Sequence, residues 1–220
     1  MTVQASFALF DFDKTLCCGD SVLPYLLYCI RKGHAPKRQI FRAAAGYVKQ
    51  RIKPSLVTVA KMEALSFITG KTEQEMDDIA RAFFREVQQK KFFKDGLAEL
   101  KHLRKEGKKI LIVSASASVY MRVLPEFLPV DAVLSTVCAV DEDGRYNGLI
   151  GENCKGLQKP LRIAEYLAAN HMTLDYATSC AYGDSASDAP MLSLTAQPVM
   201  VNPAKGLKAV LPEAKEVSWK

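Results

Sequence analysis

The feature that most constrains the fold of this chain is a short apolar segment that ends in two aspartates. Residues 6–10 read Ser-Phe-Ala-Leu-Phe, and Asp11, Phe12 and Asp13 follow them. An uninterrupted apolar run of this length is typical of a strand buried inside a parallel sheet. Ligands of open α/β sheets bind at the carboxyl ends of the strands. We therefore expect both carboxylates at a site of chemistry.

The spacing of the two aspartates predicts how they lie relative to each other. Successive side chains of a strand point to opposite faces, so Asp11 and Asp13 are expected to share a face while Phe12 packs the other way. Two carboxylates that face one cavity repel unless a cation or a shared proton separates them. The pattern favours a hard divalent metal beside a carboxylate nucleophile. A solvated turn has the same pattern, so the rest of the chain decides between the two interpretations.

Two further segments carry a polar residue next to an expected strand or helix. Ser114 follows the apolar run 110–113 and is placed to donate a hydrogen bond to an anion at the same sheet edge. Lys159 precedes Pro160 at the start of an amphipathic stretch, where backbone N–H groups already favour anions. Each has a structural alternative. A serine here, Ser116 or Ser118 included, can cap the next helix, and an isolated lysine is usually a solvated surface charge.

A fourth segment brings two more carboxylates after an apolar-leaning stretch, residues 177–181. Gly183 permits a tight exit from a strand, and Asp184 and Asp188 bracket the turn into a helix that is expected to begin near Pro190. Carboxylates at this position can complete an octahedral oxygen site around Mg²⁺. The alternative is that Asp188 simply caps the helix. The occurrence of all four segments in this order favours a functional site.

In this order and spacing the motifs resemble those of the haloacid dehalogenase (HAD) superfamily of phosphohydrolases, over nearly the whole chain. Closer features resemble its phosphoserine-phosphatase-like branch, subfamily IB. They are Val-Ser-Ala-Ser at 113–116, Asp-Gly-Arg at 143–145, Cys-x-Gly-x-x-Lys at 154–159, and Asp-Ser-x-Ser-Asp-x-Pro-Met-Leu at 184–192.

This resemblance implies a role for each matching residue. Asp11 corresponds to the nucleophile that forms an aspartyl-phosphate, and Asp13 to the general acid and base that serves the leaving group and then the water. Ser114, Ala115 and Lys159 correspond to substrate-binding positions, with Ser114 and Lys159 holding the phosphoryl oxygens. Phosphoryl transfer depends mainly on positioning and charge neutralisation, which such residues supply.

The resemblance also implies a metal site, and it leaves open which of two lysines binds the phosphate. Asp11, Asp184 and the backbone carbonyl of Asp13 are expected to bind Mg²⁺, with Asp188 orienting or assisting the site. Lys155 lies near the same segment and matches the Lys-Gly pattern of phosphoserine phosphatases, so it is an alternative phosphate-binding lysine. We prefer the later lysine, Lys159, because it completes the Cys-x-Gly-x-x-Lys pattern and precedes a proline at a helix start.

Periodicity and turn residues predict an α/β fold with a doubly wound parallel sheet. Residues 21–91 lack strand-like alternation and are expected to form several helices, one of which begins at the capping box of Thr72 and Glu75. The resemblance implies a HAD-type Rossmannoid core at 1–16 and 95–220 and a helical cap domain of the first type at 17–94. The other expected elements are helix 97–106, strand 109–114, a short helix 118–124, strand 132–136, a hairpin around Gly144, helix 160–169, strand 178–183, helix 190–195 and strand 198–202, with a last edge strand near Val217 and Trp219.

The expected cap carries the clues to the substrate. Asp20 lies where phosphoserine phosphatases have a glutamate that holds the substrate amine, so it is a substrate-binding candidate, or it caps the first helix together with Ser21. Basic residues dominate the first cap helices and alternate with apolar ones between 31 and 53. A solvated helix face explains this pattern. A surface for anionic lipid or for an acidic substrate is the sharper alternative.

Composition indicates the size of the core, the expected location and the expected partners. With 220 residues, of which 49% are hydrophobic, the chain can bury a full core. No apolar run is long enough to span a bilayer, and the amino terminus lacks the pattern of an export signal, so a cytoplasmic location is expected. The six cysteines form no Cys-x-x-Cys pair and are expected to be reduced. The net charge of +6 comes without a nucleic-acid recognition motif, so no nucleic-acid partner is expected.

These observations predict a Mg²⁺-dependent phosphomonoester phosphatase that acts on a small phosphorylated metabolite through an intermediate on Asp11. A phosphatase for phospholipid phosphates at a membrane surface is one alternative. A phosphotransferase or mutase, which passes the phosphoryl group to a hydroxyl, is another. A non-catalytic binding protein would be expected to lack one of the motif aspartates, and all four are present. The oligomeric state is not predicted.

Overall fold

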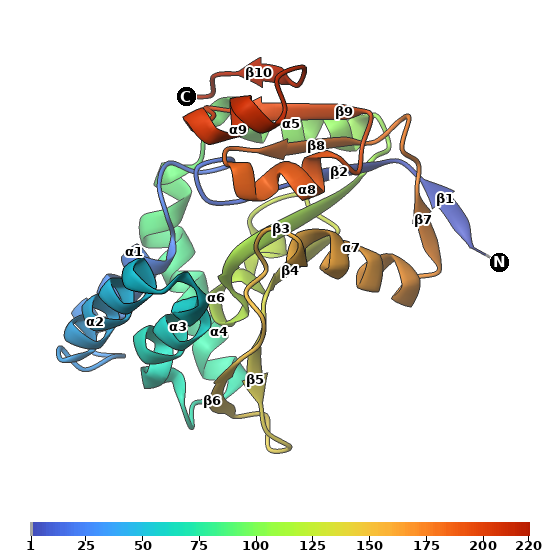
Figure 1. Cartoon of the computed structure of the whole chain (residues 1–220). Helices are drawn as coiled ribbons and strands as arrows, with labels where there is room; N and C mark the ends of the chain where they lie inside the picture. The colour runs from blue at the N-terminus through green and yellow to red at the C-terminus, as the bar shows by residue number, and fades with distance from the viewer. Residues whose placement is uncertain (1) are drawn as a thin grey trace.

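The centre of the fold is a six-stranded sheet with the order β10-β9-β8-β2-β3-β4, shown in Figure 1. The structure is a computed structural model that describes residues 2–220; Met1, the first residue of the expected core range, lies outside the described residues. Each neighbouring pair in this sheet is parallel. The strands are β2 (Phe7–Phe10), β3 (Lys109–Ala117), β4 (Ala132–Thr136), β8 (Cys180–Gly183), β9 (Gln197–Val201) and β10 (Lys215–Val217).

Strand β2 lies inside the sheet, and its side chains alternate between two buried clusters. Phe7 and Leu9 pack in the cluster that contains Ile163 of helix α7 (Gln158–Ala169), whereas Ala8 and Phe10 pack in the cluster that contains Leu100 of helix α5 (Lys94–Lys105). Both faces of the sheet are therefore covered, which explains why β2 is apolar throughout. The predicted doubly wound α/β fold is confirmed.

Helices cover the two faces of the sheet; four of them were predicted with somewhat different ends, and the last one along the chain was not predicted. They are α5 (Lys94–Lys105), α6 (Ser118–Met121), α7 (Gln158–Ala169), α8 (Ala189–Leu192) and α9 (Lys205–Val210), with short 3₁₀ turns η5 (Leu124–Glu126) and η6 (Ala186–Asp188). Helix α8 stops at Leu192 rather than near 195. Strand β3 continues to Ala117, past the predicted end at 114, because the chain keeps pairing with β4 after an irregularity in the ladder.

Four short strands lie outside the main sheet. The hairpin expected around Gly144 is present as β5 (Cys138–Val140) and β6 (Tyr146–Ile150), and the Asp141 carboxylate accepts the amides of Asp143 and Arg145 in its turn. A parallel pair of β1 (Val3–Ala5) and β7 (Met172–Leu174) was not predicted. These strands have three residues each, too few to show a recognisable period.

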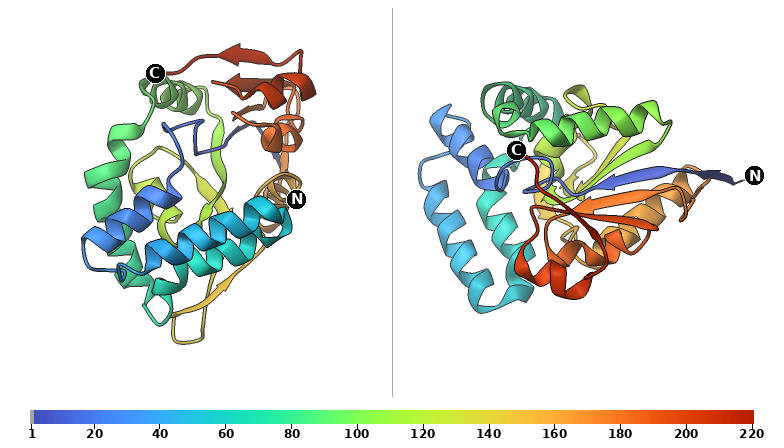
Figure 2. Two further views of the ribbon diagram at one scale, coloured as in Figure 1. Left: turned by 60° about the vertical axis from the view of Figure 1, so that its left-hand side comes forward. Right: turned by 90° about the horizontal axis from the view of Figure 1, so that it is seen from above.

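The chain between β2 and α5 is helical, as residues 21–91 predict. Its helices are α1 (Val22–Arg31), α2 (Gln39–Ile52), α3 (Val57–Leu65) and α4 (Glu73–Phe83), with 3₁₀ turns η1 (Pro54–Leu56), η2 (Ser66–Ile68) and η4 (Gln89–Lys91) and a π-helical turn η3 (Phe84–Gln88). The predicted capping box opens α4: Thr72 Oγ1 accepts the Glu75 amide at 3.1 Å, and Glu75 accepts the Thr72 amide at 2.7 Å. Figures 1 and 2 show these helices gathered beyond the end at which β2 finishes.

Aromatic packing joins the inserted helices to the rest of the molecule. The rings of Tyr25 in α1 and Phe83 in α4 pack at 5.2 Å, and Tyr25 lies 4.5 Å from the ring of Tyr120 in α6. The inserted helices therefore share one buried cluster with the sheet. Within residues 2–220, no helix combines the length and the apolar character that crossing a membrane requires.

Candidate active site

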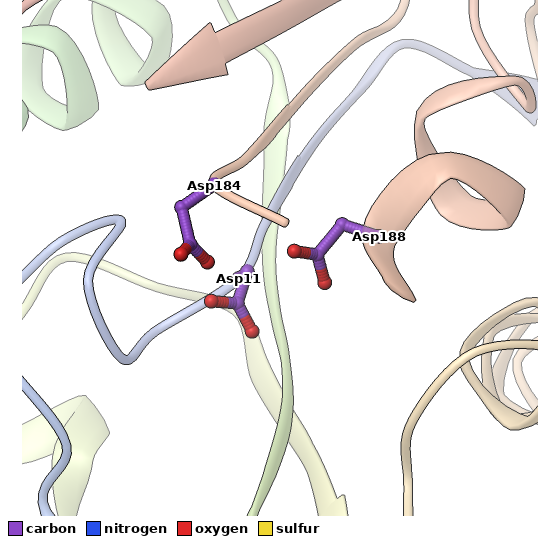
Figure 3. Close-up of side chains that lie close together, drawn as sticks. All are labelled: Asp11, Asp184 and Asp188. Carbon is purple, nitrogen blue, oxygen red and sulfur yellow. The ribbon is translucent and has the colours of Figure 1, made fainter. Parts of the chain in front are cut away.

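Neighbouring strands deliver the first two aspartates to one edge of the sheet. Asp11 follows β2 and Asp184 follows β8, and these strands pair in parallel with Phe10 beside Tyr182. The Asp11 amide continues this ladder by donating to the Tyr182 carbonyl at 2.9 Å. Parallel neighbours end at the same edge, so the two carboxylates lie close together there. Figure 3 shows them facing Asp188 across a common space.

Asp188 reaches the same point because the backbone at Gly183 lies very close to it. A Cβ atom on Gly183 would lie 2.6 Å from the Cβ of Asp188, which no side chain can accommodate. Asp188 Oδ2 accepts the Ser185 amide at 3.0 Å and the Ser185 hydroxyl at 2.7 Å. These bonds close the turn η6. Asp188 stands at the start of α8 but makes no side-chain cap bond to it, so the alternative of a simple helix cap does not describe its contacts.

Lys159 joins two of these aspartates. Its side chain is 1% exposed, and its Nζ lies 2.6 Å from Asp11 Oδ1 and 2.7 Å from Asp188 Oδ1. The lysine projects from the first turn of α7, as its position before Pro160 predicts. Lys155 is exposed. The structure thus separates the two candidate lysines by burial and brings only Lys159 into contact with Asp11.

Burial and this ion pair shape the electrostatics of the site. Burial raises the pKa of Asp11 above its usual range, against the opposing effect of the Lys159 ammonium. Burial opposes the charge of Asp188, but its ion pair with Lys159 and its hydrogen bonds from Ser185 together lower its pKa. Burial and repulsion from Asp188 raise the pKa of Asp184 to about 6. Pairs of carboxyl groups whose pKa values are pushed apart in this way are typical of catalytic sites.

The cluster of Asp11, Asp184 and Asp188 is compatible with a bound metal ion. Each residue offers one oxygen, and the three oxygens lie within 4.8 Å of one another. Lys159 supplies one positive charge against three carboxylates, so a dication would balance the ionised cluster. Among residues 2–220, no other residue donates a hydrogen bond to the Asp184 carboxylate, which leaves it available to a cation. An all-oxygen donor set of this kind suits Mg²⁺ or Ca²⁺.

Asp13 lies next to this cluster but does not join it. Its carboxylate accepts the Ser21 amide at 2.7 Å and the Ser116 hydroxyl at 2.5 Å. Burial raises the pKa of Asp13, against these two hydrogen bonds. The expectation that Asp11 and Asp13 share a strand face is wrong, because neither residue belongs to the strand. Strand β2 ends at Phe10, and the chain then enters a turn in which Lys14 has a φ of 64°.

The serines after β3's apolar run have distinct contacts. Ser114 is 1% exposed, and its Oγ accepts the Ser116 amide at 3.0 Å, which leaves its own proton free to donate to a ligand. It lies inside β3 rather than at the strand end. The alternative that Ser116 or Ser118 caps α6 is wrong: no side chain caps that helix, and Ser118 Oγ instead accepts the Cys138 amide at 2.8 Å. The Ala115 carbonyl accepts the Thr136 hydroxyl at 2.7 Å.

Asp20 is exposed at the edge of the site. Its carboxylate pairs with Lys14 at 3.2 Å, and 68% of its side chain is accessible. Neither Asp20 nor Ser21 caps α1 through its side chain, contrary to that alternative. Ser21 instead contacts Ser116 and Tyr120, each at 3.0 Å between oxygens.

Lys61 is a site residue that sequence reasoning missed. It projects from α3, and its Nζ donates to the Ala115 carbonyl and to the Asn153 side chain and lies 3.4 Å from Thr136 Oγ1. Burial lowers its pKa to about 8, although the Asp13 carboxylate opposes the shift. A lysine in a basic helical stretch resembles a surface charge, so no local signal distinguishes it from its neighbours.

One known protein family matches most of this chain. The sequence profile of the haloacid dehalogenase-like hydrolases matches residues 8–193. The chain belongs to this family. The matched range contains every residue of the site described above, and the predicted resemblance is confirmed.

Individual relatives agree with this assignment. Protein CicA of Caulobacter vibrioides is 30% identical over 189 residues, which cover 84% of this chain and 81% of that protein. Phosphoserine phosphatase SerB1 of Mycobacterium tuberculosis is 27% identical over 223 residues, covering 96% of this chain and 68% of that protein. A Bordetella pertussis protein of unknown function shares the fold, with a TM-score of 0.84, 22% identity and 99% of each chain covered.

Proposed function

We propose that this protein is a Mg²⁺-dependent phosphomonoester phosphatase that acts through an aspartyl-phosphate on Asp11. The observation that carries the proposal is the buried contact of Lys159 with Asp11 and Asp188, beside the Asp184 carboxylate, which offers an oxygen to the same cluster. Family membership and the similarity to a phosphoserine phosphatase support phosphatase chemistry. The substrate is proposed to be a small phosphorylated metabolite.

Asp11 is suited to attack phosphorus because both of its oxygens are oriented. Oδ1 contacts Lys159, and Oδ2 accepts the Thr15 hydroxyl at 3.2 Å. In the first step an Asp11 oxygen forms a bond to phosphorus while the bond from phosphorus to the leaving oxygen breaks. In the second step water attacks the same phosphorus and releases phosphate, which restores the Asp11 carboxylate.

Asp13 is proposed to move the protons of both steps. Its raised pKa favours a carboxylic acid that can give its proton to the leaving alkoxide. The carboxylate that results can then take a proton from the attacking water. The hydrogen bonds from Ser21 and Ser116 hold the group in place throughout.

Lys159 and Ser114 are proposed to hold the phosphoryl oxygens. Lys159 is a charged donor already beside the nucleophile, and Ser114 has a hydroxyl proton free for an acceptor. A Mg²⁺ ion held by Asp11, Asp184 and the Asp13 backbone carbonyl, with the help of Asp188, would reduce the repulsion between the nucleophile and the anionic substrate.

We further propose that residues 17–94 act as a cap domain that sets substrate specificity. Lys61 of α3 supports this role, because it extends a positive charge from the inserted helices to β3 and the segment before α7. Asp20 is the other candidate at the substrate end, although its carboxylate already pairs with Lys14. A cap of this kind excludes water from the reaction. The six cysteines are all free, which fits the reducing conditions of a cytoplasmic location.

The proposal is tested by phosphate release from a panel of phosphomonoesters with Mg²⁺ and with EDTA. The panel contains phosphoserine, sugar phosphates, nucleotides and phosphatidylglycerophosphate. We expect metal-dependent release that the Asp11→Asn variant abolishes while its circular dichroism stays unchanged. Substantial turnover by Asp11→Asn would refute the covalent mechanism. Transfer of phosphate to an added hydroxyl acceptor in place of release would show a phosphotransferase.

A further inference from the structure

Helix α2 lies at the outer edge of the inserted helices, with α3 on its inner side (Figures 1 and 2). It contacts the molecule through a narrow stripe of residues. Gln39 is 1% exposed, and its Nε2 donates to the Glu63 and Ala64 carbonyls of α3 at 2.5 and 2.9 Å. Gly46 is also buried and meets α3 at Ala60. The rest of the helix surface is largely open to solvent.

The face of α2 opposite this stripe is apolar. Phe41, Val48 and Ile52 are 75%, 56% and 81% exposed. Phe41 and Val48 each lie two positions after a buried residue of the stripe, which is about 200° around an α-helix. Their spacing of seven and then four residues brings Phe41, Val48 and Ile52 onto one face. We call these three residues the outward face of α2. Large apolar side chains aligned on one exposed face mark an interaction site.

Positive charge surrounds the outward face. Residues 21–62 contain nine lysines and arginines and no aspartate or glutamate. Lys32 and Lys49 pair with acidic residues from outside this segment. In the described part of the chain, no carboxylate lies within salt-bridge distance of Arg38, Arg51 or Lys53, which flank the helix on both sides and at its ends. Arg51 instead lies over the Tyr47 ring, 5.6 Å from its centre.

A hollow of about 640 Å³ continues this pattern beside the helix. It lies between α2, α3 and β6, and Ala45, Val59 and Met62 line it together with Arg42 and with the ion pair of Lys49 and Glu63. Apolar and cationic side chains therefore occur together both on the outward face and along its flank.

We propose that the outward face of α2 docks on the surface of an anionic phospholipid bilayer, with the helix lying in the interface. Apolar side chains flanked by lysine and arginine are the pattern of helices that bury one face at the boundary of headgroups and acyl chains. Anionic headgroups attract the flanking cations. A second copy of the chain is the less favourable occupant, because it would bring two surfaces rich in lysine and arginine together.

Co-sedimentation with vesicles tests this proposal. The full chain is mixed with phosphatidylcholine vesicles, with and without phosphatidylglycerol, at low and high salt. We expect binding only to the vesicles that contain phosphatidylglycerol, and we expect high salt to weaken it. Two triple variants separate the apolar and the electrostatic contributions to binding. One combines Phe41→Ser, Val48→Ser and Ile52→Ser to remove the outward face. The other combines Arg38→Glu, Arg51→Glu and Lys53→Glu to reverse the charges. Each is expected to lower the partition coefficient at least about tenfold.

Matched variants elsewhere on the surface serve as controls. Val3→Ser, Tyr176→Ser and Val210→Ser remove three side chains that are 54–63% exposed, and Lys101→Glu, Lys105→Glu and Lys215→Glu make the same change in charge. Both controls are expected to bind as the wild type does. Hydrogen exchange of the wild-type protein, which needs no variant, is expected to slow in residues 39–53 when anionic vesicles are added.

Several outcomes would overturn the proposal. The proposal fails if the wild type does not bind anionic vesicles or if it binds neutral vesicles equally well. It also fails if the control variants lose as much binding as the α2 variants. A dimer in analytical ultracentrifugation that the Phe41, Val48 and Ile52 substitutions dissociate, without any vesicle binding, would assign the face to self-association instead.

Discussion

Lys159 is buried among carboxylates, and its ammonium favours the ionised form of each one that it contacts. Its ammonium contacts one oxygen each of Asp11 and Asp188, while Asp184 has no comparable partner among residues 2–220. The three carboxyl groups are therefore chemically distinct although they lie together. This distinction leads to two predictions at the scale of single residues.

The first prediction separates the two candidate lysines. We expect Lys159→Met to reduce kcat/KM by at least about a hundredfold, because it removes a charged donor beside Asp11, the proposed nucleophile. The same change leaves two buried carboxylates unpaired and is expected to lower stability by about 3–5 kcal/mol near pH 8. The loss should shrink at pH 5, where these carboxyl groups can protonate.

Lys155→Met, an exposed control, should change stability by less than about 0.5 kcal/mol. Steady-state kinetics and urea unfolding provide the measurements, and a larger kinetic effect of Lys155→Met would reverse our assignment.

The second prediction concerns the charge of Asp184. Its pKa rises from 3.8 to about 6 on folding, so the ionised group disfavours the metal-free folded state by about 3 kcal/mol above pH 6, and by nothing below pH 4. We expect Asp184→Asn to stabilise the metal-free protein by about 1–3 kcal/mol at pH 7.5, with the gain disappearing as the pH falls to 4.

Thermal unfolding across this pH range, with and without Mg²⁺, measures the effect. The variant should also lose the stabilisation that Mg²⁺ gives the wild type. Asp143→Asn, at an exposed turn, is the control and should show neither change. A destabilised Asp184→Asn protein at pH 7.5 would contradict the assigned shift.

At the scale of elements, close backbone approach explains several of the glycines. Gly183 allows the chain after β8 to pass Asp188, and Gly46 allows α2 to approach α3. A Cβ on Gly46 would lie 3.0 Å from the Ala60 Cα and 3.1 Å from its carbonyl oxygen. Because α2 packs mainly on α3, this contact and the hydrogen bonds of Gln39 attach it to the molecule.

We therefore predict that Gly46→Leu weakens the packing of α2 on α3. Overpacking at such a contact costs about 1–3 kcal/mol, and hydrogen exchange should accelerate in α2 before the sheet is affected. Ala44→Leu places the same side chain at an exposed position of the same helix and should leave exchange unchanged. Equal exchange rates in Gly46→Leu and wild type would show that the two helices tolerate a wider separation.

At the scale of the whole molecule, the edge of the sheet that carries the aspartates and the inserted helices meet through a few buried polar contacts. Lys61 links α3 to the Ala115 carbonyl and to Asn153, and Ser21 links the start of α1 to Ser116 and Tyr120. The serine link also contacts Asp13 through Ser116. Movement of the inserted helices would therefore alter the surroundings of the proposed acid and base.

Lys61→Met tests this coupling. We expect it to lower kcat/KM by about tenfold, equivalent to about 1.4 kcal/mol, because it removes the charged donor that ties α3 to the core. Hydrogen exchange in α3 should accelerate at the same time. Lys90→Met, an exposed lysine on η4, is the matched control. Unchanged kinetics with accelerated exchange would show that the link is structural only.

Much of the fold could be predicted from the sequence because its signals are local. The apolar runs of β2 and β3, the capping box at Thr72 and the turn at Gly144 each lie within a few residues. The unpredicted β1 and β7 are too short for a period, and the true end of β3 depends on its pairing with β4. The placement of Asp11 and Asp184 at one edge followed from the parallel pairing of the strands that precede them.

The sequence by itself determined the parallel α/β core, the family and the residues that carry charge at the strand ends, because these depend on hydrophobic periodicity and short motifs. Only the tertiary structure decided which charges meet. It buried Lys159 against Asp11 and Asp188, left Lys155 and Asp20 exposed, and brought Lys61 to β3 from a helix about fifty residues away in sequence. The physical reason is that the pKa and the partners of an ionisable group are set by burial and by contacts distant in sequence, which no local pattern encodes.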